Sequence, residues 1–103
     1  MIVELTQDTF DDALKTEGTI IIDFWSTNCG PCKIYSNILG WVEKENPDTP
    51  IYKLNVDEAL ELAKKYQISS LPTTIFFKNG EEQERLIGMQ PKCKLNSTIK
   101  KYD

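Results

Sequence analysis

The hydrophobic positions of the chain follow two spacings that alternate along its length. Short runs rich in β-branched and aromatic residues are typical of strands, and apolar residues three or four positions apart are typical of helices. The strands that this pattern predicts cover residues 2–5, 19–25, 51–56, 73–77 and 82–87. The predicted helices carry their apolar residues at Phe10, Ala13 and Leu14; at Ile34, Ile38, Leu39 and Val42; at Leu60, Ala63 and Tyr66; and at Leu95, Ile99 and Tyr102.

Several element boundaries carry their own local signals. Thr6 to Asp8 offer a cap for the first helix, and Asp57 offers one for the third. The second helix is expected to run from Cys32 and to stop by Asn46. Lys78 to Glu81 form a strong signal for a tight hairpin. The last two strands should therefore pair antiparallel.

The segment Thr19–Trp25, TIIIDFW, predicts the centre of the sheet. It is apolar on both faces except at Asp23, a pattern typical of a strand that is covered on both sides. Alternating strands and helices favour parallel crossovers, and the terminal hairpin adds antiparallel strands. We therefore expect an α/β fold, with a central mixed five-stranded sheet flanked by helices on both faces. Residues 1–103 are expected to form a single domain with a real core.

Composition and charge narrow the function classes. The 16 acidic and 12 basic side chains give a net charge of −4, which repels phosphate backbones and argues against nucleic acid as a partner. The longest apolar run, Ile20 to Ile22, is far too short to cross a bilayer, so no membrane association is expected. The first residues, MIVELTQDTFDD, show no basic start followed by an apolar stretch. We expect a cytoplasmic protein and a monomer.

The candidate chemistry lies in the stretch WSTNCGPCK, where Cys29 and Cys32 are three positions apart. A closed zinc site usually needs four Cys or His ligands, and the chain has three cysteines and no histidine. A three-cysteine site completed by a carboxylate or a second chain stays open, but no metal is expected. A disulfide across two residues constrains little chain entropy, so a structural staple is also disfavoured. A redox-active pair is the interpretation that remains.

The residues around the pair support this chemistry. Cys29 follows a strand and a short loop, and Pro31 suits the first position of a helix, so Cys29 should cap that helix. Unpaired backbone N–H groups and the helix dipole favour a thiolate there by roughly 0.3–2 kcal/mol. A stabilised thiolate is also a better leaving group. Cys32 can therefore attack Cys29 from the same helical turn and resolve a mixed disulfide.

At these residues the chain resembles the thioredoxin family, and the resemblance covers nearly its full length. The motifs that match in order and spacing are Asp23-Phe24-Trp25, Cys29-Gly30-Pro31-Cys32-Lys33, Lys53-Leu54-Asn55-Val56-Asp57, Leu71-Pro72-Thr73, Phe77-Lys78-Asn79-Gly80 and Gly88. The resemblance implies a thioredoxin-like fold and a thiol–disulfide oxidoreductase that reduces protein disulfides as an electron carrier. It implies that Cys29 attacks and Cys32 resolves, with Gly30 and Pro31 between them. It also implies that Pro72 is cis beside the active site and that Gly88 leaves room for a substrate backbone.

The resemblance assigns roles to further residues. Asp23 is either a satisfied structural acid or a buried proton acceptor for Cys32, and its place in the motif favours the second interpretation. Lys53 is either the supporting partner of Asp23 or a residue at an exposed edge. Trp25 is either a core residue or part of the substrate surface. The residues expected to contact substrate are Trp25, Asn28, Leu71, Pro72, Gly88 and Met89.

Three residues depart from the family pattern. Asn28 stands where the family usually has tryptophan, Asn37 stands where many members have proline, and Cys93 is an additional cysteine expected to take no part in the cycle. The implied partners are protein disulfides and a thioredoxin reductase, which works through NADPH and flavin or through ferredoxin. No cofactor is expected to be bound by the chain itself. The alternatives are a thiol oxidase or isomerase, which the Gly-Pro dipeptide disfavours, and an adapter that acts by binding alone.

Overall fold

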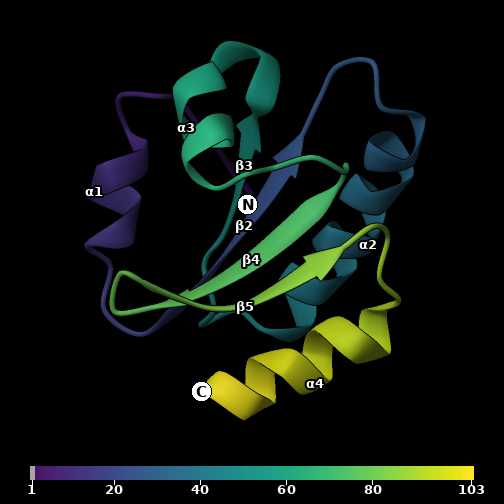
Figure 1. Cartoon of the computed structure of the whole chain (residues 1–103). Helices are drawn as coiled ribbons and strands as arrows, with labels where there is room; N and C mark the ends of the chain where they lie inside the picture. Colours follow the sequence, from purple (N-terminus) through teal and green to yellow (C-terminus); the bar gives the residue numbers. More distant parts are fainter. Residues whose placement is uncertain (1) are drawn as a thin grey trace.

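The protein folds into one five-stranded sheet with helices on both sides, shown in Figure 1 by a computed structural model that describes residues 2–103. The strands are β1 (Val3–Leu5), β2 (Thr19–Trp25), β3 (Ile51–Asn55), β4 (Thr73–Lys78) and β5 (Glu81–Ile87). The helices are α1 (Phe10–Leu14), α2 (Gly30–Glu45), α3 (Leu60–Lys65) and α4 (Lys92–Tyr102), with a short 3₁₀ turn, η1 (Val56–Glu58), before α3. The predicted α/β class and the mixed five-stranded sheet are confirmed.

The sheet has the order β1-β3-β2-β4-β5, with β2 at its centre. β2 pairs parallel with β3 and antiparallel with β4, and β4 pairs antiparallel with β5 across the hairpin. In the hairpin turn, Asn79 and Gly80 both have positive φ angles (52° and 85°), as a tight two-residue turn requires. The central position of β2 explains why six of its seven residues are buried.

Each face of the sheet has its own core. Helices α1 and α3 cover one face and α2 and α4 cover the other (Figure 1). The first core contains Leu5, Phe10, Ala13, Ile20, Ile22, Phe24, Leu54, Ala59, Leu62, Ile75 and Phe77. The second contains Ile21, Tyr35, Leu39, Val42, Ile51, Phe76, Leu86, Leu95 and Ile99. Because successive strand residues face opposite sides, Asp23 lies on the same side of β2 as Ile21, under α2.

Some predicted boundaries differ from the structure. Helix α2 begins at Gly30, two residues before the predicted start at Cys32. Asp57 does not cap α3, because it lies in η1 and the N-cap of α3 is Ala59. Leu60, predicted to be a core position of α3, is 68% exposed, while Ala59 and Leu62 are buried in its place. Tyr66 of the same predicted helix is partly buried and packs against the first core.

The topology brings four chain segments together at one edge of the sheet. Trp25, at the end of β2, pairs with Asn55 at the end of β3. Phe24 pairs with Thr73 at the start of β4, and Thr73 pairs with Ile87 at the end of β5. The loop after β2, the 3₁₀ turn after β3, the segment before β4 and the segment after β5 therefore all start from the same edge.

Candidate active site

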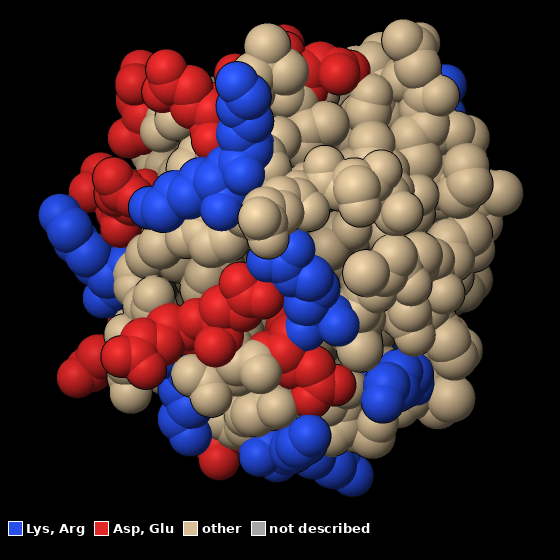
Figure 2. All heavy atoms as spheres, viewed as in Figure 1, with Lys and Arg blue, Asp and Glu red and all other residues tan. Residues whose placement is uncertain are grey.

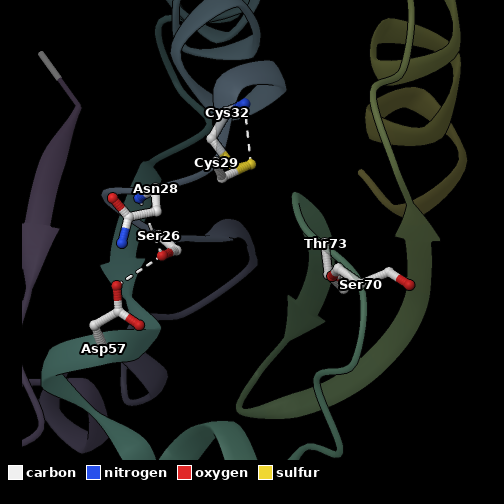
Figure 3. Close-up of a disulfide and its surroundings, with 7 residues drawn as sticks. All are labelled: Ser26, Asn28, Cys29, Cys32, Asp57, Ser70 and Thr73. Atoms are coloured by element: carbon white, nitrogen blue, oxygen red, sulfur yellow. Dashed lines mark hydrogen bonds between the residues drawn. A yellow bond between two sulfur atoms is a disulfide. The ribbon is translucent and has the colours of Figure 1, made fainter.

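The cysteines of the CGPC motif form a disulfide at this edge of the sheet. Cys29 and Cys32 are bonded, with their Cα atoms 5.3 Å apart (Figure 3). Cys29 is the N-cap of α2, as predicted, and its Sγ accepts a 3.2 Å hydrogen bond from the N–H of Cys32. Gly30 and Pro31 are the exposed first residues of the helix. Cys29 is half-buried, whereas Cys32 is only 2% exposed. A partner can therefore reach Cys29 more easily than Cys32.

Ser26 fixes the loop that carries Cys29. Its hydroxyl donates a 2.6 Å hydrogen bond to Oδ2 of Asp57 (Figure 3). Oγ of Ser26 also accepts a 3.4 Å hydrogen bond from the N–H of Asn28, and the carbonyl oxygen of Ser26 accepts a 3.2 Å hydrogen bond from the N–H of Cys29. Sequence reasoning did not identify this contact between Ser26 and Asp57. The sequence signal that could have indicated it is the position of Ser26, a small residue with a hydroxyl group, directly after the apolar strand β2.

The segment before β4 lies at the same edge. The Leu71–Pro72 peptide bond is cis, as the resemblance implied, and Pro72 is buried. The carbonyl oxygen of Pro72 accepts a 2.8 Å hydrogen bond from the N–H of Gly88, whose φ is +85°. Thr73 closes the turn by donating its hydroxyl to the carbonyl oxygen of Ser70 at 2.6 Å (Figure 3). Pro72 and Gly88 therefore belong to one locally fixed structure.

Asp23 is buried directly behind the disulfide helix. It is 0% exposed, and neither carboxylate oxygen has a hydrogen-bond partner among residues 2–103. Burial is the main reason that the pKa of Asp23 rises from 3.8 to about 7. The ammonium group of Lys53 lowers this pKa in part, and the carboxylate of Glu4 raises it further. Asp23 can therefore exchange a proton near neutral pH.

Lys53 lies beside Asp23 but bonds elsewhere. The two residues are paired in register between β2 and β3. The ammonium group of Lys53 donates a 3.1 Å hydrogen bond to Oγ of Ser36 and lies 4.6 Å from the centre of the Trp25 ring. Because β3 lies between β1 and β2, the alternative of an exposed edge position is wrong. Lys53 is an electrostatic neighbour of Asp23.

The remaining predicted contact residues surround the disulfide on the surface. Trp25 is half-buried at the end of β2 and donates its indole N–H to Glu4 at 3.0 Å. Asn28 and Met89 are exposed, and Leu71 is half-buried against the first core. Ile34, one of the apolar residues of the predicted second helix, is 59% exposed, and Ile87 at the end of β5 is 60% exposed. Figure 2 shows that the right side of the molecule, over α2, carries few charged side chains.

Cys93 is exposed at the start of α4, far along the chain from the disulfide. Within the described part of the chain, no three or more His, Cys, Asp or Glu side chains gather closely enough to hold a metal ion. None of the helices in residues 2–103 combines the length and apolar character needed to span a membrane.

Comparison with known proteins defines the class. A family model described as Thioredoxin matches residues 1–101. The chain is 42% identical to the M-type chloroplastic thioredoxin of Spinacia oleracea, covering 97% of this chain but 59% of the spinach protein. It is 39% identical to the thioredoxin of Staphylococcus saprophyticus, covering 98% of this chain and 97% of the bacterial one.

Solved structures agree with the sequence comparison. The crystal structure of oxidized mitochondrial thioredoxin 3 from Saccharomyces cerevisiae superposes with a TM-score of 0.88 at 32% identity, covering 97% of this chain and 94% of that one. The chain belongs to the thioredoxin family.

Proposed function

We propose that the protein reduces disulfide bonds in other proteins, with Cys29 as the attacking thiol and Cys32 as the resolving thiol. One observation carries the assignment of roles: Cys29 caps the N-terminus of α2 and is accessible, whereas Cys32 is 2% exposed. The helix N-terminus favours a thiolate at Cys29. Cys32 lies about one turn further along α2. Because it is buried, it can attack only the sulfur of Cys29 inside the protein.

The cycle follows from these positions. In the reduced protein, the Cys29 thiolate attacks one sulfur of a substrate disulfide, which forms a mixed disulfide and releases one substrate thiolate. Cys32 then loses its proton and attacks Sγ of Cys29, which releases the second substrate thiolate and forms the Cys29–Cys32 bond seen in the structure. Two electrons pass from the protein dithiol to the substrate disulfide. Gly30 and Pro31 keep the two cysteines within bonding distance at the start of α2.

Asp23 takes the proton of Cys32 in this proposal. Its carboxylate is buried and unpartnered, and its pKa of about 7 lets it accept a proton at neutral pH and release it again. Lys53 supports Asp23 by keeping the pKa from rising further. These features favour the functional interpretation of Asp23 over a purely structural one.

Substrate contacts come from the surface around the disulfide. The proposed contact residues are Trp25, Asn28, Leu71, Pro72, Gly88 and Met89, all at or beside the edge where β2, β4 and β5 meet. Gly88 has no atoms within 4 Å of the place where a side chain would begin, so it leaves space for an extended backbone. The protein acts as a monomer in this proposal.

The protein is recycled in this proposal by a thioredoxin reductase, which draws on NADPH and flavin or on ferredoxin. The Gly-Pro dipeptide supports a reductant over a thiol oxidase or isomerase. The proposed compartment is the reducing cytoplasm, because the exposed thiol of Cys93 has no partner cysteine in this chain. An electron-carrier role between reductase and substrate follows from the cycle.

Reduction of a protein disulfide, with dithiothreitol as the electron source, tests the proposal. We expect Cys29→Ser to abolish catalysis and Cys32→Ser to accumulate a mixed disulfide that mass spectrometry detects on Cys29. Cys93→Ser is the matched control and should retain activity, because Cys93 lies outside the site. A Cys29→Ser/Cys32→Ser variant that supports the same rate would contradict the proposal and favour an adapter.

A further inference from the structure

Three polar residues form a row beneath α2 on three neighbouring strands. Asp23 on β2 is flanked by Lys53 on β3 and by Thr74 on β4, both paired with it in register. Side chains of such neighbours on one face of a sheet come within about 5 Å of each other. Asp23 therefore has a possible ionic partner on one side and a possible hydroxyl donor on the other. Its carboxylate bonds to neither of them.

Two consecutive residues of α2 bond to the neighbours of Asp23. Oγ of Ser36 accepts a 3.1 Å hydrogen bond from the ammonium group of Lys53. The hydroxyl of Tyr35 is 2.7 Å from Oγ1 of Thr74, and both of these side chains are 0% exposed. A buried hydroxyl without a partner is costly, so this contact holds both groups in place. Each neighbour of Asp23 thus has its hydrogen bond in the helix above.

We propose that Ser36 and Tyr35 are positioning residues that hold Lys53 and Thr74 away from the carboxylate of Asp23, so that this carboxylate remains free to take a proton. The inference rests on the proposed function, in which Asp23 accepts the proton of Cys32. Cys32 lies on the same side of α2, three and four residues before Tyr35 and Ser36. The helix that carries the resolving thiol therefore also controls the surroundings of its base.

The physical reason is the sensitivity of a buried carboxylate to its neighbours. A cation within about 4–6 Å lowers the pKa of a carboxylate by about 1–3 units, and a donated hydrogen bond lowers it as well. A carboxylate with either contact would stay ionised at neutral pH and would bind a proton poorly. Tyr35 and Ser36 carry no charge, and their hydrogen bonds to Thr74 and Lys53 leave the Asp23 carboxylate without a bond to either neighbour, so that Lys53 lowers its pKa only in part.

The charged and titratable groups around Asp23 come from three elements. Lys53 of β3 lowers its pKa and Glu4 of β1 raises it, while α2 contributes Tyr35 and Cys32. Burial raises the pKa of Tyr35 above its usual range, so its hydroxyl stays protonated and neutral at any physiological pH. Thr74 from β4 has no charge. Among residues 2–103, Lys53 is therefore the one cation whose position can change the titration of Asp23 strongly.

Carbon-13 NMR of the Asp23 carboxyl group in the oxidised protein measures the predicted effect directly. We expect Ser36→Ala to release Lys53 toward Asp23 and to lower the midpoint of the Asp23 titration by about one pH unit, as a nearby cation does. Ser36→Thr keeps the hydroxyl and should restore the midpoint. Ser97→Ala, the same change at an exposed position of α4, is the matched control and should leave the midpoint unchanged.

Tyr35→Phe tests the other neighbour. Loss of the tyrosine hydroxyl frees the hydroxyl of Thr74 to bond to Asp23, so the midpoint should fall. In the double variant Tyr35→Phe/Thr74→Val this hydroxyl is absent, and the fall should disappear. If Tyr35→Phe disturbs the fold, as circular dichroism would show, Ser36→Ala and Ser36→Thr decide the matter alone.

The outcomes separate this inference from the proposed function. An unchanged Asp23 midpoint in Ser36→Ala overturns the inference, whatever the activity of the variant. Asp23→Asn tests the function separately through the pH dependence of disulfide reduction. A profile that Asp23→Asn leaves unchanged removes Asp23 from the proposed cycle, while the NMR midpoints still decide whether Ser36 and Tyr35 control its protonation.

Discussion

The backbone N–H of Gly88 donates a 2.8 Å hydrogen bond to the carbonyl oxygen of Pro72, so the end of β5 is tied to the cis-proline turn. This bond continues the pairing of β4 with β5 by one step beyond Thr73 and Ile87. The positions of the two residues are thus fixed by the sheet. A substrate segment that contacts Pro72 will also pass over Gly88.

Gly88→Ala should impair docking more than chemistry. The φ of +85° places residue 88 in the left-handed region, where a side chain costs roughly 1–2 kcal/mol of stability. The new methyl group would also stand in the space proposed for a substrate backbone. We expect a higher KM for a protein disulfide, with an unchanged rate toward a small disulfide such as dithiobis(nitrobenzoic acid).

Gly40→Ala is the matched control for this substitution. Gly40 lies inside α2 with a normal helical φ and open space beside it, so alanine should stabilise the protein by about 0.5–1 kcal/mol. Its KM should not change. Equal KM values for Gly88→Ala and the parent protein would remove Gly88 from the substrate surface.

Asp23→Asn should make the oxidised protein more stable at alkaline pH. Asp23 has a pKa of about 7 when folded and an ordinary value of 3.8 when unfolded, so the folded state binds more protons between these values. The free energy of unfolding therefore falls as pH rises from about 4 to about 7, and it stays low above that range. At 1.36 kcal/mol per pKa unit, the loss is at most on the order of 4 kcal/mol.

Denaturant unfolding at pH 4 and pH 8 measures this effect. The asparagine variant should gain stability over the parent protein at pH 8 and little at pH 4. Asp12→Asn is a suitable control, because Asp12 and its partner Lys15 are both 78% exposed and their ion pair contributes little. A stability difference that does not grow with pH would show that Asp23 is ionised at low pH in the folded protein.

Alkylation of the reduced protein should distinguish the three cysteines. At mildly acidic pH, iodoacetamide should modify Cys29 first, because the helix N-terminus favours its thiolate and Cys32 is buried. Cys93 is exposed and lies in the first turn of α4, so its rate is an internal reference for a surface thiol at the start of another helix. Peptide mass spectrometry gives the order of labelling. Modification of Cys32 before Cys29 would reverse the two proposed roles.

Asn28→Trp should improve the use of macromolecular partners. An exposed indole beside Cys29 adds apolar docking area, and complete burial of one large side chain contributes roughly 1.5–3 kcal/mol. The backbone N–H that bonds to Ser26 is retained in the variant. We expect a lower KM for a protein disulfide or a thioredoxin reductase and no change toward a small disulfide.

Asn37→Trp separates this effect from a general gain in hydrophobicity. Asn37 is also exposed, but it lies further along α2, about one and a half turns beyond Cys32. The Asn37→Trp substitution should leave the KM for a protein disulfide unchanged. If Asn28→Trp gives no benefit with any protein partner, the surface around Asn28 is suited to a partner that does not need the indole.

The sequence predicts the parts of the site that depend on local pattern. The β-branched run of β2 indicated a central strand, and the order of Cys29, Gly30 and Pro31 indicated a capped helix, and both were confirmed. The cis bond at Pro72 came only through the family resemblance, because local sequence does not distinguish it from a trans bond. The prediction that Leu60 is a core position was wrong, because periodicity cannot reveal a 3₁₀ turn inserted before a helix.

Contacts between distant elements were beyond the reach of sequence reasoning. The bond from Lys53 to Ser36 depends on the strand register and on the rotation of α2 above it. The contact between Tyr35 and Thr74 depends on the same two features. The visible signals were Lys53 and Thr74, polar residues within largely apolar strands. Neither residue type identifies its partner without the placement of β4 beside β2.

The strand order makes the site inseparable from the complete sheet. A fragment that ends after α2 would keep Asp23, Cys29 and Cys32, yet β2 would lose β3 on one side and β4 on the other. The complementary fragment would keep Pro72 and Gly88 but no disulfide. Each half is therefore inert alone, and two such fragments would recover function only by reassociating along both edges of β2.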